Sequence, residues 1–514
     1  MGPNDIRTQG LKDGSRRMRI GGWIALFAIL AGTLLLGLSG LNRSLWLDEA
    51  WVANSVRERS VWAMLHYSQW LQTSPPLFLL IARAAVSGFG LSLDTLRSVP
   101  LLFSLLAAIA MFGAARKVVG LTWAFAATAV LIFSPTAVEH LRSFKQYAGE
   151  TAATCALLWL AATYLESHEL RRFRWLCAAT AILLCLSYPL VFLIPGLVLA
   201  VWWNGGPMRA RLLLAVASLV ELPLYWFQIR PNIAPDLWTF WGTGWSDSLS
   251  LSTILAAVFC AFVTARMVGS MDSGRSVSNP DWRIGFRVVC LLACFLYLNA
   301  EMFRWYPTDP RMRLFLWPCL LLLGAMELDD LYRRLPSSIK EVVAVCVVIA
   351  TALSMTWTVG RIWSGPPEQT IEEYGAALRI LRNQVSPNDL LLVHADAKQG
   401  FLLQAAIDHW PELEWGSRTR FGETGWPCCA RGRDLVPGRL ESKAVTRDLT
   451  RMVPKGFSGR VWLFYGNRPL HWKYLGLDEG DLWRRTMWER GCPPMEYLAL
   501  GNLVISPMGC TETK

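Results

Sequence analysis

Two adjacent carboxylates, Asp48 and Glu49, follow the first apolar run of the chain in an aromatic segment between Trp46 and Trp51. Acidic side chains at a membrane surface are costly if they contact lipid. One carboxylate could act as a general base toward an acceptor hydroxyl, while the other binds or orients the substrate. The alternative is a structural role, because the dipole of a helix favours acidic residues in its first turn. The residues alone leave both interpretations open.

A second group of candidate side chains lies between residues 139 and 150. Arg142 could hold a phosphate through a bidentate fork and Lys145 as a point charge. The alternative is that these basic side chains only extend toward the interface from the end of a span. His140 alone carries little weight as a metal ligand or proton relay. The pocket candidates in this segment are Glu139, His140, Gln146 and Tyr147.

A third group surrounds Tyr306 and includes two further candidate phosphate ligands, Arg304 and Arg311. Together the three groups suggest a cavity that receives an anionic lipid headgroup. The sequence contains no P-loop, no Gly-rich dinucleotide fingerprint and no zincin motif. We therefore do not expect chemistry driven by a bound nucleotide. We expect no cofactor; a divalent metal is possible but not favoured, because no additional acid is clearly placed.

The composition indicates an integral membrane protein. Of the 514 residues, 53% are hydrophobic and only 17% are charged, whereas about a quarter of a soluble protein is charged. The 26 Trp residues fit an aromatic belt at the membrane interface. The net charge of +11 does not indicate nucleic-acid binding, because the basic residues lie mostly in short loops between apolar runs.

Basic loops mark the cytoplasmic side and so give an orientation to each span. This topology places residues 1–20 in the cytoplasm as a tail, followed by a membrane domain over 21–360 with about eleven crossings. It also places all three candidate groups on the outer face of a bacterial cytoplasmic (inner) membrane. The predicted spans are 21–40, 98–115, 121–138, 147–165, 174–187, 189–204, 210–228, 249–268, 284–300, 313–328 and 341–360.

The apolar segment Pro75–Gly90 does not fit as a span, because counting it would put the basic Arg116–Lys117 pair outside. It also carries Arg83 midway, which would cost roughly 2.5–3.5 kcal/mol at the bilayer centre. A helix lying in the interface suits both facts. Residues 41–97 are therefore predicted to form one exoplasmic loop with interfacial helices.

Residues 361–514 lack long apolar runs and are predicted to form a periplasmic or extracellular α/β domain. We expect helices over 368–385 and 477–490, and strands over 390–394, 460–465 and 495–506. Four cysteines lie here, Cys428, Cys429, Cys492 and Cys510, which allow three disulfide arrangements. Pairing of the neighbours Cys428 and Cys429 is the least favoured because it is strained.

Four short motifs in order resemble the GT-C superfamily of membrane glycosyltransferases. The similarity is to bacterial family 39 members, related to protein O-mannosyltransferases and the lipid A aminoarabinose transferase, and it covers roughly residues 20–330. Two departures are Lys145, where many relatives have Arg, and Glu139-His140, where they often have aromatic residues. The motifs are Leu45–Ala50, Gln72–Leu77, Ser134–Ala148, and Tyr306-Pro307 followed by Arg311, Phe315 and Pro318.

The resemblance implies a polytopic α-helical GT-C fold and an inverting transfer of a sugar from a polyprenyl-phosphate donor. The acceptor would be a glycan, a lipid or a protein outside the membrane. Asp48 would then match the catalytic base and Glu49 a supporting acid. Lys145 would match a ligand of the lipid phosphate, with Arg311 as a helper.

Two other functional classes fit a polytopic membrane protein. A transporter or flippase should show charges within its spans or paired broken helices in two halves. Glu221 is the clearest charge inside a predicted span, and no second half mirrors the first. A non-catalytic scaffold for envelope glycan assembly would use residues 365–514 only to display a surface to a partner.

Overall fold

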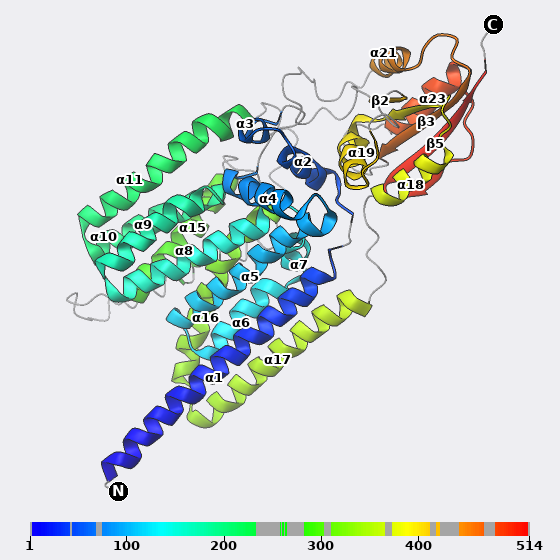
Figure 1. Ribbon diagram of the computed structural model, residues 1–514. Coiled ribbons are helices and arrows are strands. Elements are labelled where there is room, and N and C mark those ends of the chain that lie inside the picture. The colour runs from blue at the N-terminus through cyan, green and yellow to red at the C-terminus, as the bar shows by residue number, and fades with distance from the viewer. Residues whose placement is uncertain are drawn as a thin grey trace.

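The computed structural model describes residues 3–41, 44–67, 74–232, 258, 260, 261, 263, 264, 282–302, 310–364, 373–411, 418–421, 442–466 and 479–511. These residues form a helical bundle and a smaller α/β domain beside one of its ends (Figure 1). That end carries the short helices α2 (Leu47–Val56), α3 (Val61–Leu65) and α4 (Pro76–Phe89), and we call it the α2 end.

Ten of the eleven predicted spans coincide with helices, and the span predicted over 249–268 falls largely outside the described residues. Six helical segments of the described chain are long and apolar enough to cross a membrane. The bundle is a multi-pass membrane structure. Its helices are α1 (Pro3–Leu38), α5 (Leu93–Val118), α6 (Leu121–Phe133), α8 (Tyr147–Ser167), α9 (Leu170–Leu184), α10 (Ile194–Gly205), α11 (Pro207–Leu224), α15 (Trp282–Met302), α16 (Trp317–Arg334) and α17 (Ser337–Ser364).

The centre of the bundle is the pair α5 and α8, which share the most extensive contact between any two helices described. Both helices bury alanines, among them Ala107 and Ala108 on α5 and Ala152 and Ala153 on α8. Small side chains let two helix backbones approach closely. The outer helices α1 and α17 instead expose large apolar side chains such as Phe27 and Trp357, as expected for surfaces that face lipid.

Helix α4 is the segment that we predicted to lie in the interface. The Arg83 guanidinium donates to the carbonyl oxygens of Glu58 and Arg59, at 2.7 and 3.2 Å. This arrangement gives a cation in an apolar helix polar partners in the neighbouring loop. Helix α5 begins at Leu93, five residues before the span that we predicted over 98–115.

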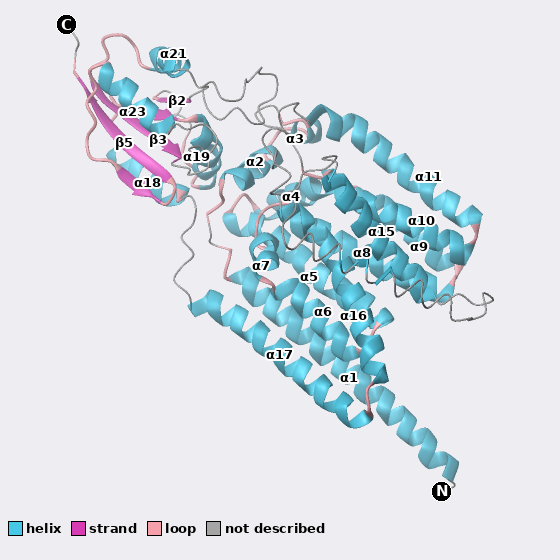
Figure 2. Ribbon diagram, turned by 180° about the vertical axis from the view of Figure 1, so that it is seen from behind, coloured by secondary structure: helices cyan, strands magenta, loops and turns pink. Residues whose placement is uncertain are grey.

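The α/β domain contains a five-stranded mixed sheet with helices on both faces (Figure 2). The strand order is β2-β1-β3-β5-β4; β1, β2 and β3 are parallel, and β5 is antiparallel to both β3 and β4. One face packs against α18 and α19, the other against α21 and α23. The elements are α18 (Tyr374–Gln384), β1 (Leu390–Val393), α19 (Ala395–Ile407), β2 (Thr419–Phe421), α21 (Ser442–Met452), β3 (Gly459–Gly466), α23 (Glu479–Glu489), β4 (Leu498–Leu500) and β5 (Leu503–Cys510).

The strands predicted near 390 and 460 and the helix predicted near 477–490 are confirmed. The single strand predicted over 495–506 is wrong, because β4 and β5 form a hairpin instead. Leu500 pairs with Leu503, so Gly501 and Asn502 form a two-residue turn. Gly501 has a φ of 59°, the left-handed conformation that such turns require and that glycine adopts without strain.

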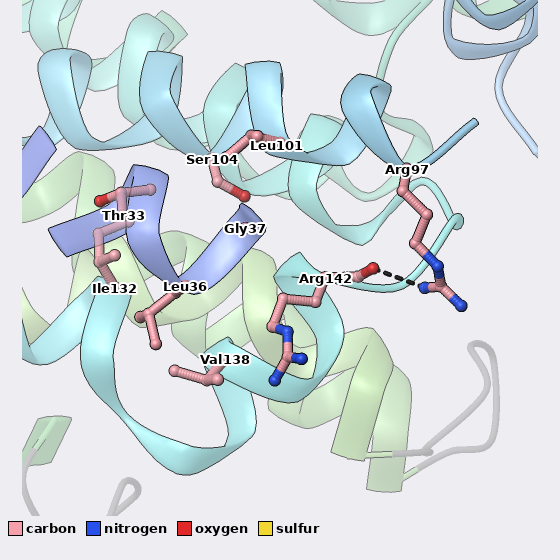
Figure 3. Close-up of a pocket in the computed structure, with 9 residues that line it drawn as sticks. All are labelled: Thr33, Leu36, Gly37, Arg97, Leu101, Ser104, Ile132, Val138 and Arg142. Atoms are coloured by element: carbon pink, nitrogen blue, oxygen red, sulfur yellow. Dashed lines mark hydrogen bonds between the residues drawn. The ribbon is translucent and has the colours of Figure 1, made fainter. Parts of the chain in front are cut away.

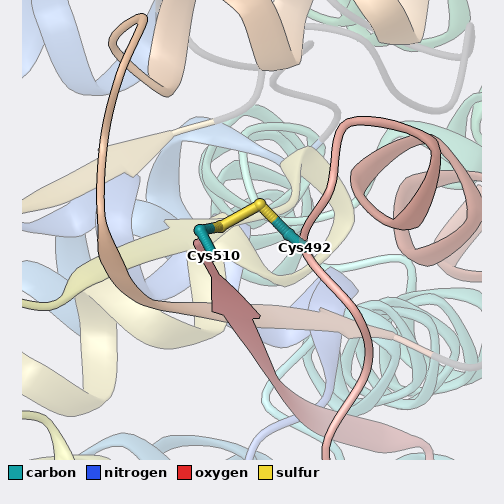
Figure 4. Close-up of a disulfide and its surroundings, with 2 residues drawn as sticks. All are labelled: Cys492 and Cys510. Atoms are coloured by element: carbon teal, nitrogen blue, oxygen red, sulfur yellow. A yellow bond between two sulfur atoms is a disulfide. The ribbon is translucent and has the colours of Figure 1, made fainter. Parts of the chain in front are cut away.

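One disulfide joins Cys492 and Cys510 (Figure 4). The segment after α23 pairs with the end of β5, where the Gly509 N–H donates to the Pro493 carbonyl at 3.0 Å. This pairing brings the two cysteines together. The bond belongs to the arrangement that we favoured least, and the two arrangements that cross-pair the four cysteines are therefore wrong. Cys428 and Cys429 lie outside the described residues.

Candidate active site

The helix that carries Asp48 and Glu49 starts at the α2 end of the bundle. Trp46 is its N-cap residue, in an extended conformation, and its backbone N–H donates to Glu49 Oε2 at 3.1 Å. This bond is half of a capping box, in which a glutamate three residues into the helix satisfies an otherwise unpaired backbone donor. Both acids therefore do stand at a helix start. Their burial differs, since Glu49 is 1% exposed and Asp48 is partly exposed.

Glu49 is held by a buried ion pair with Arg97 of α5. The guanidinium donates to both carboxylate oxygens, at 2.9 and 3.0 Å. The Phe144 N–H donates to Glu49 Oε1 at 2.5 Å. With the cap bond from Trp46, the carboxylate accepts four hydrogen bonds, which is about the number of lone-pair sites it has. This geometry suits Glu49 to positioning rather than to proton transfer.

Arg97 connects three further parts of the α2 end. It also donates to the carbonyls of Arg142, at 2.7 Å, and Ser44, at 2.9 Å. The Arg97 guanidinium thereby connects α5 to three other parts of the chain: the segment before α2, the start of α2 and the turn before α8. Sequence reasoning missed Arg97, although an arginine in an apolar helix near the end of a span is itself a signal.

Helix α7 (Pro135–Leu141) and the turn before α8 bring most of the second candidate group together. Lys145 and Gln146 are each 8% exposed and precede the first residue of α8, Tyr147. The Tyr147 and His140 rings pack edge to face with centroids 5.6 Å apart. Because Phe144 donates to Glu49, this segment lies directly against the start of α2. Glu139 is exposed, unlike the rest of the group.

Arg142 faces a different direction from its neighbours. Its side chain extends toward Val138 and the end of α1, where its Nε lies close to Gly40 (Figure 3). It lines a small pocket with Arg97, Thr33, Ser104 and apolar residues of α1, α5, α6 and α7, with a cavity volume of about 20 Å³. A cavity of this size holds one or two water molecules. It is too small for a sugar, so this pocket is not the donor site.

Ser74, which immediately precedes the Pro75-Pro76 motif, lies at the junction of four elements. Its hydroxyl donates to Gln146 Oε1 at 3.3 Å. Its carbonyl accepts hydrogen bonds from the Tyr188 hydroxyl, at 3.3 Å, and from Gln228 Nε2, at 3.2 Å. Tyr188 begins the 3₁₀ helix η1 (Tyr188–Leu193), and Gln228 lies in the turn η2 (Tyr225–Ile229) after α11. The described part of the second motif therefore lies beside Gln146.

The third candidate group is described only in part. Arg304 and Tyr306 lie outside the described residues, and the side chain of Arg311 does as well. The backbone of Arg311 belongs to the 3₁₀ helix η4 (Pro310–Leu316), which packs against α7 and α8. The element that carries Arg311 therefore lies next to the two helices that flank the Lys145 turn.

Comparisons with known proteins identify the fold. The sequence matches no protein-family model, and no curated protein sequence is significantly similar to it. Among solved structures, ArnT from Cupriavidus metallidurans superposes with TM-scores of 0.54 in the apo state and 0.53 bound to undecaprenyl phosphate. Each ArnT chain is 14% identical, and the match covers 95% of this chain and 98% of that one. The chain has a GT-C-like fold.

Another similar structure is the oligosaccharyltransferase AglB from Archaeoglobus fulgidus, with a TM-score of 0.49 and 12% identity. That match covers 96% of this chain and 75% of AglB. The match with ArnT covers 95% of this chain, so the GT-C-like fold extends over nearly the whole chain, including the α/β domain.

In this GT-C-like structure the α/β domain contacts the helix of the acidic pair directly. Asn54 of α2 donates to the backbone carbonyl and the side-chain Oε1 of Gln399 on α19, at 2.8 and 2.9 Å. The Tyr67 hydroxyl donates to the same Oε1 at 3.0 Å. Burial raises the pKa of Tyr67, so the phenol stays protonated and keeps donating. This three-residue contact joins the two parts of the molecule less than two helical turns from Asp48.

Replacing Gln399 by alanine should loosen this contact. The variant removes the side-chain acceptor that Asn54 and Tyr67 share, so the Tyr67 hydroxyl loses this acceptor while Asn54 keeps the backbone carbonyl. Loss of a buried acceptor costs about 1–3 kcal/mol. We expect a lower melting temperature and faster proteolytic release of the α/β domain. The matched control is Gln404→Ala on the same helix, because Gln404 donates to Asp408, the C-cap residue of α19, instead. Equal behaviour of the two variants would show that the contact contributes nothing.

Proposed function

We propose that this chain is a membrane glycosyltransferase that uses a polyprenyl-phosphate sugar as its donor. The observation that carries the proposal is the position of Asp48, at a helix start fixed by the Glu49–Arg97 pair against the Lys145–Gln146 segment. It is supported by the fold that the chain shares with ArnT, one structure of which contains undecaprenyl phosphate. The acceptor is a glycan, a lipid or a protein on the outer face of the membrane.

In the proposed reaction, Asp48 removes the proton from an acceptor hydroxyl as its oxygen attacks the anomeric carbon of the sugar. The new bond joins that oxygen to the anomeric carbon, and the bond from this carbon to the phosphate oxygen breaks. The leaving group is the polyprenyl phosphate. A single displacement of this kind inverts the anomeric configuration.

The role of Lys145 follows from the charge that develops on the leaving group. A fixed cation at the phosphate stabilises the transition state more than the ground state, because the negative charge grows as the bond breaks. Lys145 is almost fully buried beside Gln146, where a charge interacts more strongly than in water. Arg311 is the proposed helper, from the neighbouring η4.

The function is tested by mass spectrometry of lipids and envelope glycans from a strain that lacks the gene. We expect an acceptor to lose one sugar and the polyprenyl-phosphate sugar to accumulate. Wild-type protein should restore both, and purified protein in nanodiscs should release polyprenyl phosphate from the accumulated lipid. If the purified protein only moves that lipid across a bilayer without cleaving it, the chain is a flippase and the proposal is wrong.

Lys145→Met tests the phosphate ligand. Removing one group that stabilises transition-state charge costs about 10²–10³ in rate, so we expect a loss of this size in kcat/KM for the lipid donor. Lys117→Met is the control, because Lys117 forms a partly exposed ion pair with Glu166, at the ends of α5 and α8 remote from Lys145. Equal activity of Lys145→Met and wild type would show that Lys145 is not a ligand of the donor phosphate.

A further inference from the structure

A buried acid on α8, Glu150, has no role in the mechanism above. It lies in the first turn of α8 and is 6% exposed. Its backbone N–H donates to the Gln146 carbonyl at 2.9 Å, but its carboxyl group makes no hydrogen bond or ion pair with any residue that the structure describes. In a helical bundle such a group is costly, because nothing replaces the water that it loses. Ionisable groups in this position therefore commonly serve function.

Two other buried hydroxyls, on α8 and just before η1, also lack hydrogen-bond partners among the described residues. Thr154 lies four residues after Glu150 and hence on the same face of α8. Its Oγ1 is buried without a hydrogen bond, whereas Thr151 donates to the carbonyl four residues before it, at 2.8 Å. The Oγ of Ser187, in the turn before η1, is likewise buried and unpaired. Both residues are 0% exposed.

Tyr188 connects these groups to the candidate active site. Glu150 and Glu221 of α11 both lie close enough to interact electrostatically with its phenol. The phenol donates to the carbonyl of Ser74, whose own hydroxyl donates to Gln146. Along α8, Glu150 lies about one helical turn from Gln146, roughly 6 Å, and Thr154 lies about one further turn beyond Glu150.

We propose that Glu150, Thr154, Ser187 and Tyr188 form the subsite that binds the hydroxyl groups of the donor sugar. The inference rests on the proposed function, in which Lys145 holds the phosphate attached to that sugar. A carboxylate accepts hydrogen bonds from sugar hydroxyls, and the Ser, Thr and Tyr hydroxyls can both donate and accept. A bound sugar would give the unpaired polar atoms the partners that they lack in the protein alone.

The test compares Glu150→Gln with wild type in nanodiscs. The probes are undecaprenyl-phosphate glucose, mannose and galactose, and the monodeoxy analogues of whichever sugar is transferred. A site built to hydrogen-bond a hydroxyl discriminates strongly against an analogue without it. In Glu150→Gln we expect donor KM to rise by about ten- to a hundredfold, as for loss of a hydrogen bond to a charged group. Discrimination against one deoxy analogue should fall by the same factor.

Stability separates this role from a structural one. Glutamine has the shape of glutamate and no charge. If Glu150 binds no ligand, Glu150→Gln should therefore be as stable as wild type, or more stable, and its donor KM should not change. Glu166→Gln at the other end of α8 is the matched control, because Glu166 pairs with the partly exposed Lys117. If Glu150→Gln does not fold, Ser187→Ala replaces it, with the same expected loss of discrimination.

The outcomes distinguish this inference from the function on which it rests. If Glu150→Gln keeps wild-type KM and wild-type discrimination while the wild type transfers sugar, the subsite is wrong and the proposed function stands. If the wild type cleaves none of the polyprenyl-phosphate sugars, including the lipid that accumulates in the deletion strain, both are wrong.

Discussion

Asp48→Asn should lower kcat by about 10²–10⁴-fold, the usual contribution of a general base. Asparagine keeps the size of aspartate but cannot take the proton of the acceptor hydroxyl. The folded structure should persist, because the group at this position is partly exposed. The measurement is release of polyprenyl phosphate by purified protein under saturating donor, together with the melting temperature.

The control for Asp48→Asn is Asp94→Asn. Asp94 occupies the same position in α5 as Asp48 does in α2, two residues after the N-cap. Both substitutions remove the same favourable interaction with a helix dipole, about 0.3–1 kcal/mol at an exposed site. Only the base hypothesis predicts that they differ in kcat. Equal kcat values for the two variants would show that Asp48 is not the general base and has only a structural role at the helix start.

Arg97→Met should destabilise the protein by about 3–5 kcal/mol, the typical cost of breaking a buried ion pair from one side. The substitution leaves the Glu49 carboxylate buried without its cation and removes the donors to the Ser44 and Arg142 carbonyls. We expect a large fall in melting temperature and in folded yield. Arg172→Met is the control, because the Arg172–Glu169 pair is largely exposed and such pairs contribute about 0–1 kcal/mol.

The double variant Arg97→Met with Glu49→Leu separates charge from packing. Replacing both partners of a buried pair by apolar residues is often neutral or stabilising, so the double variant should regain much of the lost stability. Its activity should stay low, because Glu49 no longer caps α2 or receives the Phe144 N–H. If the double variant is no more stable than Arg97→Met, the buried charge is not the cause of the loss.

The sequence by itself determined the elements of this protein and the order of its motifs. Apolar runs of span length predicted ten of the described bundle helices, because the bilayer sets the length of a spanning helix. Apolar alternation and turn residues predicted β1 and β3. The Gly501-Asn502 turn was overlooked, although Gly-Asn is a hairpin signal. The acidic pair at the start of α2 was visible in the sequence, but its two interpretations were not separable there.

Only the tertiary structure decided which of these residues meet. Glu49 pairs with Arg97, 48 residues later, and Asn54 pairs with Gln399, 345 residues later. No local pattern encodes either pair, because helix packing, and not residue spacing, sets distances between elements. The same packing buried Glu150 and gave its carboxyl group no partner among the residues that the structure describes. Local sequence patterns thus located Asp48 and Glu49. Long-range packing distinguished Glu49, which Arg97 holds in place, from Asp48, which is partly exposed.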